Sequence, residues 1–287
     1  MSLFKGAATA LITPFKDGKI DYVSMGKLIE WQINQGIDAL VVCGTTGEAS
    51  TLSVMEKLQL VRFAVDLTDG RVPVIAGSGT NNTAAAADLS KGMEDAGADG
   101  LLIVTPYYNR CTESGLISHY EKIADDVSIP IIMYSVPSMT GVNITPAAVA
   151  ALSQHPNIVG IKEASGNISQ ICQIASYIGD GFDMYSGNDD QTVPLMSLGG
   201  IGCISTVSNI IPGRFANMTR DFLNGNYIQA GKEQVAIKPL IDSLFVPVKA
   251  ALNMMRMCNL EYRLPMCPPS NKTQYMVYDA LEEFGLI

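Results

Sequence analysis

Histidine is almost absent from this sequence of 287 residues, which contains only His119 and His155. Neither histidine belongs to an HExxH-type spacing and the six cysteines include no CxxC pair, so we expect no metal site. We therefore expect both histidines to be structural. Several cysteines lie within apolar runs, where free thiols behave as small hydrophobic side chains. This pattern favours a reduced, cytoplasmic protein.

Basic residues are also scarce, because 19 lysines and arginines stand against 28 aspartates and glutamates, for a net charge of -9. No local run of basic residues offsets this charge, so we expect no nucleic-acid partner. No apolar run reaches the roughly 18 residues that span a bilayer. The first apolar segment is too short for a secretory signal, and Pro14 and Lys16 interrupt the stretch after it. The sequence therefore predicts a soluble protein that does not bind a membrane.

The sequence is rich in a regular alternation of two kinds of segment. Short apolar runs of β-forming residues alternate with segments of helical periodicity. The expected strands are 7–12, 39–43, 72–76, 100–104, 129–134, 158–163, 182–185 and 200–205. The expected helices between them are 22–35, 53–67, 83–96, 113–126, 146–154 and 168–178. Strict alternation implies parallel strands.

Eight such units without a break in composition favour a closed (β/α)₈ TIM barrel over an open sheet. No GxGxxG follows the first strand, which weakens the doubly wound alternative. From Asn209 the chain continues for longer than a barrel requires. We therefore expect a (β/α)₈ catalytic barrel over residues 1–224 and an appended C-terminal helical region over residues 225–287.

The strand expected at 158–163 carries one lysine, Lys162, at a position where a core side chain belongs. Period-two alternation places Ile158 and Lys162 on one face and Val159 and Glu163 on the other, so Lys162 points inward if the strand closes a barrel. Burial favours the neutral amine, which is the nucleophile that forms a Schiff base with a ketone. The alternative is a structural lysine paired with a buried carboxylate.

Polar and glycine-rich clusters follow the strands, at the end where barrel enzymes place their active sites. Taken one at a time, each cluster has a structural alternative. A Thr-Thr-Gly segment is also an ordinary turn, a Tyr-Tyr pair is often core, and Asp189 and Asp190 can cap a helix. Their joint placement favours a functional Lys162. The clusters are 44–48, 77–79, 105–109, 134–137, 186–189 and 205–206.

The chemistry of this ring suits an α-keto acid such as pyruvate. Hydroxyls and amides at Thr45, Thr46 and Gly47 can hold a small carboxylate without a cation. Imine and enamine formation both require proton transfers, yet no histidine or acidic dyad stands at these strand ends. Tyrosine and threonine hydroxyls can relay protons instead, and Tyr134 lies one strand from Lys162.

These motifs closely resemble the dihydrodipicolinate synthase and N-acetylneuraminate lyase superfamily of pyruvate-dependent class I aldolases. The resemblance covers nearly the whole chain, and the TPYYNR segment at 105–110 looks specifically like the synthase branch. The matching segments are 44–48, 105–110, 134–137, 160–164, 186–189 and 263–265.

The resemblance implies the catalytic roles of four residues. Lys162 would form the Schiff base with pyruvate. Thr45, Tyr108 and Tyr134 would form the proton relay, with Tyr108 supplied across a subunit interface. The same resemblance places Thr46, Gly47, Gly187 and Ile204 at the substrate, Thr46 at the pyruvate carboxylate and Ile204 through its backbone carbonyl.

The resemblance also implies a reaction and an assembly. Members of the synthase branch condense pyruvate with L-aspartate 4-semialdehyde in lysine and diaminopimelate biosynthesis, without an organic cofactor. They are commonly homotetramers built as dimers of dimers. We expect the same of this chain.

Three departures from the synthase pattern bear on substrate and regulation. Met139 stands where an arginine is expected to bind the semialdehyde carboxylate, and such a charge-assisted contact is worth about 1.5–3 kcal/mol. A short insert expected between Val246 and Pro247 is missing, so the rim of the site is expected to be remodelled. In the lysine feedback site of sensitive members, two histidines and a glutamate are replaced, although Asn81 and Tyr107 match. The replacements are Val54, Lys57 and Ala85, and they predict weak inhibition by L-lysine.

These departures leave alternatives open. The leading hypothesis is the synthase with reduced affinity for its second substrate. The second is an aldolase that acts on a 2-keto-3-deoxy sugar acid or related 4-hydroxy-2-oxo acid through the same imine, because such enzymes carry an apolar residue at the position of Met139. The third is a non-catalytic ligand-binding barrel, in which Lys162 forms no covalent adduct.

Overall fold

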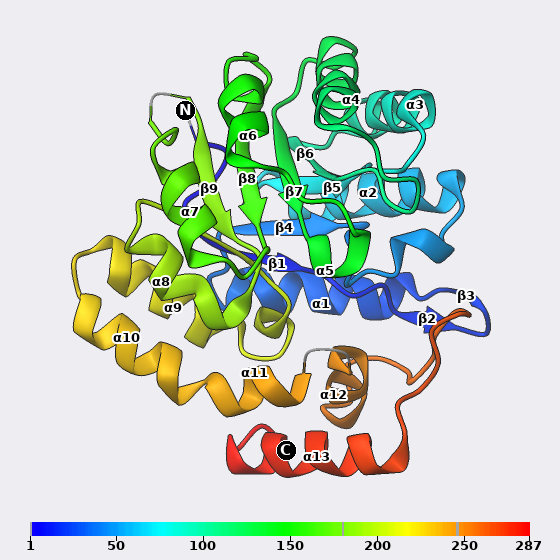
Figure 1. Ribbon diagram of the computed structural model, residues 1–287. Coiled ribbons are helices and arrows are strands. Elements are labelled where there is room, and N and C mark those ends of the chain that lie inside the picture. Colours follow the sequence, from blue (N-terminus) through cyan, green and yellow to red (C-terminus); the bar gives the residue numbers. More distant parts are fainter. Residues whose placement is uncertain (1, 180, 245–246) are drawn as a thin grey trace.

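The computed structural model describes residues 2–179, 181–244 and 247–287 of the chain. Its centre is a closed barrel of eight parallel strands (Figure 1), which confirms the fold predicted from the alternating pattern. Neighbouring strands pair in the order β1-β10-β9-β8-β7-β6-β5-β4. Their bounds are β1 Gly6–Ala10, β4 Ala39–Val42, β5 Val74–Gly77, β6 Gly100–Val104, β7 Ile131–Ser135, β8 Ile158–Glu163, β9 Asp183–Ser186 and β10 Gly202–Ser205.

Helices follow the barrel strands and cover the outside of the barrel. Several begin at a side-chain cap, and the predicted start of α6 is confirmed because the Thr145 hydroxyl accepts a 3.1 Å hydrogen bond from the Ala148 amide, with Pro146 at the first helical position. A small antiparallel pair, β2 Phe15–Lys16 and β3 Lys19–Ile20, lies outside the barrel. The helices are α1 Tyr22–Asn34, α2 Val54–Thr68, α3 Thr83–Asp95, α4 Glu113–Asp125, α5 Pro137–Thr140, α6 Pro146–Leu152, α7 Ile168–Ala175, α8 Thr192–Met196 and α9 Pro212–Leu223. Short 3₁₀ turns are η1 Ala49–Thr51, η2 Asp189–Gln191 and η3 Val207–Asn209.

Strand β8 deviates from simple alternation, because the pairing of β7 with β8 shifts register between Ile131 and Ile132. As a result Ile158 joins Ile161 in the core between barrel and helices, whereas Val159 packs against the cluster inside the barrel. The predicted faces of Ile158 and Val159 were therefore wrong. A β-bulge adds a residue and reverses the alternation on one side of it. Beyond the bulge the predicted inward direction of Lys162 is confirmed, since it lines the internal cavity.

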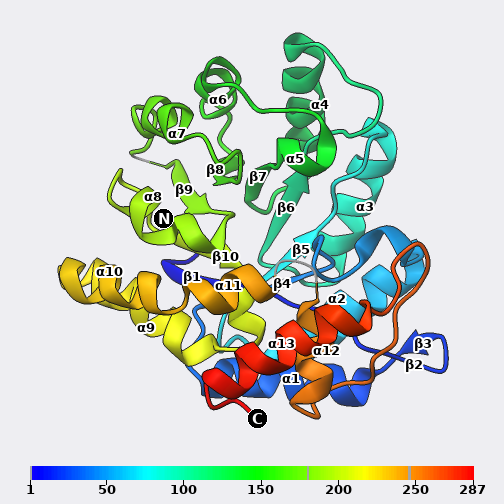
Figure 2. The same cartoon turned by 60° about the horizontal axis from the view of Figure 1, so that its bottom comes forward.

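Among the described residues, four further helices follow the last barrel helix, and the boundary expected between residues 224 and 225 falls between α9 and α10. Figure 2 shows α11, α12 and α13 lying together on one side of the barrel, and α13 contacts both of the other two. The missing insert falls beside residues 245–246, which lie outside the described residues. The four helices are α10 Tyr227–Ala236, α11 Lys238–Leu244, α12 Val248–Met254 and α13 Asn271–Glu283.

Candidate active site

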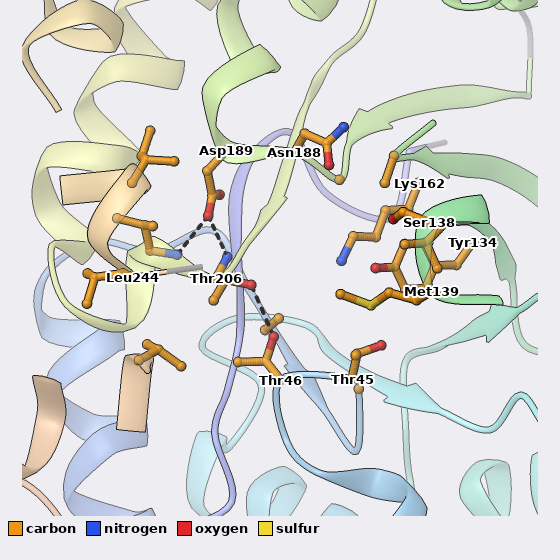
Figure 3. Close-up of a pocket in the computed structure, with 18 of the residues that line it drawn as sticks. Thr45, Thr46, Tyr134, Ser138, Met139, Lys162, Asn188, Asp189, Thr206 and Leu244 are labelled. Atoms are coloured by element: carbon orange, nitrogen blue, oxygen red, sulfur yellow. Dashed lines mark hydrogen bonds between the residues drawn. The ribbon is translucent and has the colours of Figure 1, made fainter. Parts of the chain in front are cut away.

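A cavity of about 660 Å³ lies at the carboxyl ends of the barrel strands, and α11 and α12 also line it. The closed parallel barrel brings the ends of all its strands to one face, which explains how distant segments of the sequence meet here. Figure 3 shows side chains from the loops after β4, β9 and β10 facing the same space as Lys162 of β8. The predicted convergence of these polar segments is confirmed for the clusters that begin at Gly44, Tyr134, Ser186 and Ser205.

Lys162 points into this cavity and is 5% exposed. Its Nζ lies 4.2 Å from the centre of the Tyr134 ring, on the neighbouring strand β7, in register with it. Among residues 2–179, 181–244 and 247–287, no carboxylate forms a salt bridge with Lys162. The alternative of a structural ion pair at Lys162 is therefore not supported. The arrangement leaves the amine free to react with a ligand in the cavity.

Gly187, after β9, packs directly against the lysine. A Cβ atom at this position would lie 3.0 Å from Cε and 3.1 Å from Cγ of Lys162, and 2.7 Å from Cβ of Ala164. These separations are shorter than van der Waals contact, so the space beside the lysine stem requires glycine. Gly187 therefore helps to define the position of the Lys162 side chain.

Opposite the lysine, three side chains form a connected set. The hydroxyls of Thr46 and Thr206 lie 3.1 Å apart, and one Asp189 oxygen accepts hydrogen bonds from the amides of Thr206, at 3.2 Å, and Val207, at 2.9 Å. Figure 3 draws these contacts. Burial raises the pKa of Asp189, although the hydrogen bonds from this loop and the charge of Lys162 act against the rise. Asp189 thus binds the two backbone amides at the start of η3, in the loop after β10.

The outer face of β8 carries a second polar network. The Glu163 carboxylate is buried and accepts hydrogen bonds from the Ser165 amide at 2.7 Å and from Gln170 at 3.3 Å. Gln170 in turn exchanges two hydrogen bonds with Asn143. Burial raises the pKa of Glu163. This network stabilises β8, the strand that carries Lys162, on the face opposite the cavity.

The predicted site residues fall into two groups, those that line the cavity and those that do not. Thr45, Thr46, Tyr134, Lys162 and Gly187 line the cavity, together with Met139, whose side chain is 55% exposed. The remaining predicted residues, Gly47, Ile204 and Tyr108, are absent from the cavity wall of the described chain.

Each of these three residues has another environment. The Gly47 carbonyl accepts a 2.6 Å hydrogen bond from the Thr13 hydroxyl, and Ile204 is buried in the cluster inside the barrel. Tyr108 is 84% exposed and has a left-handed backbone, with φ of 73°. Within one chain, Tyr108 therefore does not reach the cavity.

The sequence places Thr206 in the polar cluster at 205–206 but predicts no individual role for it, and it predicts none for Lys249, although both line the cavity. Lys249 carried the same signal as Lys162, a lysine inside an apolar run. Thr206 carried only its place directly after a strand.

Residues 2–179, 181–244 and 247–287 contain neither a candidate metal cluster nor a helix that could span a membrane. No group of three or more histidine, cysteine, aspartate or glutamate side chains there could hold a metal ion. No helix in the same ranges is long and apolar enough to cross a bilayer.

Fold and site together define a (β/α)₈ barrel with a buried lysine at the carboxyl end of a strand, and this lysine forms no salt bridge within the described residues. Such an arrangement is typical of Schiff-base lyases. The chain belongs to the dihydrodipicolinate synthetase family, which matches residues 3–284. The family expected from the sequence is thereby confirmed.

Individual relatives match along the whole chain. The 4-hydroxy-tetrahydrodipicolinate synthase of Thermoanaerobacter sp. (strain X514) is 46% identical over 293 residues, covering 100% of this chain and 99% of the relative. The solved dihydrodipicolinate synthase of Thermotoga maritima is 41% identical, with a TM-score of 0.98 and 100% of both chains covered. The synthase of Acinetobacter baumannii, solved with pyruvate, is 38% identical, with a TM-score of 0.96 and 99% of both chains covered.

Proposed function

We propose that the cavity binds pyruvate as a Schiff base on Lys162 and condenses it with L-aspartate 4-semialdehyde. The chain has 4-hydroxy-tetrahydrodipicolinate synthase activity, a lyase reaction of lysine biosynthesis, as the sequence resemblance implied. The observation that carries the role of Lys162 is its burial in the cavity without a carboxylate partner among the described residues.

The steps follow from the amine. Lys162 Nζ attacks the keto carbon of pyruvate, and the carbinolamine loses water to give an imine. Removal of a methyl proton yields an enamine, whose carbon attacks the aldehyde carbon of the semialdehyde. The amino group of the semialdehyde then displaces Lys162 at the imine carbon and closes the ring. The atoms balance as two substrates giving one product and one water.

Hydroxyl groups provide the proton transfers in this proposal. Tyr134 is the nearest candidate, because its ring lies beside Lys162 Nζ. Thr45 lines the same cavity and extends the relay. Thr46 binds the pyruvate carboxylate through its hydroxyl and amide.

We assign Tyr108 to the same relay, but in the site of a neighbouring subunit. Its exposure of 84% and its strained backbone are consistent with a side chain that is placed by an assembly. This assignment requires at least a dimer, and we propose a homotetramer built as a dimer of dimers. Sedimentation equilibrium tests it, and a monomer at assay concentrations with full activity would remove Tyr108 from the relay.

A reducing compartment suits the cysteines, because all six are free thiols. Three of them, Cys43, Cys203 and Cys258, are buried. We accordingly propose a cytoplasmic location.

The described part of the cavity wall lacks the arginine that is expected to bind the second substrate. The cationic residues that line the cavity within the described residues are Lys162 and Lys249, and Lys249 is paired with Glu48. Met139 cannot bind a carboxylate, so we expect a high KM for the semialdehyde. Met139→Arg should lower this KM by about tenfold or more, because it restores a charge-assisted hydrogen bond. An unchanged or higher KM would count against the synthase geometry.

The decisive assay is the initial rate with pyruvate and L-aspartate 4-semialdehyde, coupled to dihydrodipicolinate reductase and followed by NADPH loss. Turnover supports the synthase function. Borohydride trapping of pyruvate, with Lys162→Ala as control, tests the imine separately. Trapping without turnover would favour the aldolases of 2-keto-3-deoxy sugar acids, for which Met139 in place of the expected arginine is the favouring observation. No adduct on Lys162 would favour a non-catalytic barrel.

A further inference from the structure

We propose that Thr206 is a positioning residue that orients the hydroxyl of Thr46 toward the bound carboxylate, with Asp189 holding Thr206 in place. The inference rests on the proposed function at one point, the binding of the pyruvate carboxylate by Thr46. It adds a role for two residues, Thr206 and Asp189, that the family resemblance leaves without one.

The hydroxyl groups of Thr46 and Thr206 form a pair at the cavity wall. Thr46 follows β4 and Thr206 follows β10, and their Oγ1 atoms lie 3.1 Å apart at the cavity wall. Within the described residues, each of these two oxygens has the other as its sole protein hydrogen-bond partner. Figure 3 shows the pair below Asp189.

The two hydroxyl groups share two hydrogens, and their placement decides which group can bind an anion. Each hydroxyl donates one hydrogen and can accept others. If Thr46 donates to Thr206, it has no hydrogen left for a carboxylate. If Thr206 donates to Thr46, the hydrogen of Thr46 is free to point into the cavity, and the donated bond strengthens it as a donor. Binding of an anion by the Thr46 hydroxyl therefore requires Thr206 as the donor within the pair.

Asp189 holds the backbone of Thr206 in place. Asp189 accepts the amides of Thr206 and Val207, so its carboxylate fixes the start of the loop after β10. The carbonyl of Asp189 itself accepts a 3.0 Å hydrogen bond from Gln234 of α10, a buried side chain. A helix outside the barrel thus helps to fix the position of the hydroxyl pair. Thr206 can turn its hydroxyl toward Thr46 without moving its backbone.

The experiment compares Thr206→Val, which is nearly isosteric and lacks the hydroxyl, with Thr206→Ser, which keeps it. Thr206→Val should raise the KM for pyruvate about five- to tenfold, the effect of one neutral hydrogen bond, while kcat and the KM for the semialdehyde change less than about twofold. Because Thr206→Ser keeps the hydroxyl, its KM for pyruvate should lie within about twofold of the KM of the unaltered protein. Thr273→Val, on α13 away from the cavity, is the matched control and should change neither constant.

A double-mutant cycle with Thr46→Val separates positioning from direct binding. If Thr206 acts only through Thr46, Thr206→Val has no further effect once the Thr46 hydroxyl is gone. Additive effects would overturn the positioning role, as would an unchanged pyruvate KM in Thr206→Val or an equal rise in Thr206→Ser. Borohydride trapping of pyruvate by the unaltered protein is run in parallel. Failure of that trapping refutes the imine, whereas normal trapping with an unaffected Thr206→Val refutes only this inference.

Discussion

Lys249 in α12 donates a hydrogen bond to the carboxylate of Glu48, the residue that ends the Gly44-Thr45-Thr46-Gly47-Glu48 loop after β4. Both side chains are buried, and Lys249 Nζ also donates to the Glu261 carbonyl at 3.1 Å. The other Glu48 oxygen accepts the Arg263 amide at 3.3 Å. The C-terminal region is therefore joined through a buried charge pair to the loop that carries Thr45 and Thr46.

Removing one partner of this pair should destabilise the fold. Lys249→Met leaves the Glu48 carboxylate buried and unpaired, so we expect the free energy of unfolding to fall by about 3–5 kcal/mol. The double variant with Glu48→Gln should lose less, because no charge remains buried alone. Urea unfolding measures both. Lys122→Met, which breaks the exposed pair with Asp126, serves as control and should leave the urea midpoint almost unchanged.

Gly187→Ala should reduce turnover because its new methyl group displaces the Lys162 side chain. Misplacement of a reacting group by about 1 Å can cost up to about 100-fold in rate, so we expect a fall in kcat of about 10- to 100-fold. Steady-state assays check this. Gly231→Ala in α10 is the matched control, because no described atom beyond its chain neighbours and its own helix backbone lies within 4 Å of its added Cβ. Equal kcat in both variants would show that the lysine position tolerates the methyl group.

Tyr134→Phe should keep the fold and lose the proton transfers assigned to the hydroxyl. General acid–base groups contribute about 10²–10⁴-fold, and we expect kcat to fall within that range. The rate of borohydride trapping with pyruvate should fall as well, since carbinolamine dehydration needs a proton. Tyr278→Phe on α13, with its exposed ring, is the control. A normal trapping rate in Tyr134→Phe would place the relay elsewhere.

Glu163 gives a pH-dependent contribution to stability. Because burial raises its pKa, the folded protein binds more protons than the unfolded chain between pH 4.5, the ordinary value, and the raised pKa. Stability from this group is present below pH 4.5 and is lost as pH rises through the raised pKa. Glu163→Gln removes the titration, so the variant should gain stability relative to the unaltered protein as pH rises. Unfolding free energies measured from about pH 4 to about pH 8 check the sign, and a constant difference would contradict it.

Inhibition by L-lysine should be weak. Val54, which is 58% exposed, and Ala85 stand where sensitive relatives are expected to carry charged or polar ligands. Neither side chain can bind the charges of an amino acid. Initial rates across a lysine titration test this, and half-maximal inhibition at sub-millimolar lysine would refute it.

Local pattern was sufficient for much of the site. The alternation of short apolar runs and helical segments predicted the barrel, and the barrel rule then placed the strand-end clusters on one face. Lys162 was recognisable because a lysine in an apolar strand needs a partner or a reaction. The family motifs around Lys162 indicated the activity. They lie at strand ends, and the barrel fold holds these ends in the same relative positions in each family member.

Other features depended on closure of the barrel. Thr46 and Thr206 are 160 residues apart, and Glu48 and Lys249 are 201 residues apart, so no local pattern indicates that they meet. The bulge in β8 likewise arises from pairing with β7, and it reversed the predicted faces of two residues.

The sequence by itself therefore determined the fold class, the family and the buried lysine of the cavity, because each depends on periodicity or on a short motif. Only the tertiary structure decided which hydroxyl faces which, which buried charges pair and which residues reach the cavity within one chain. Those contacts join segments whose separation along the chain is large, and their geometry exists only after the strands have closed.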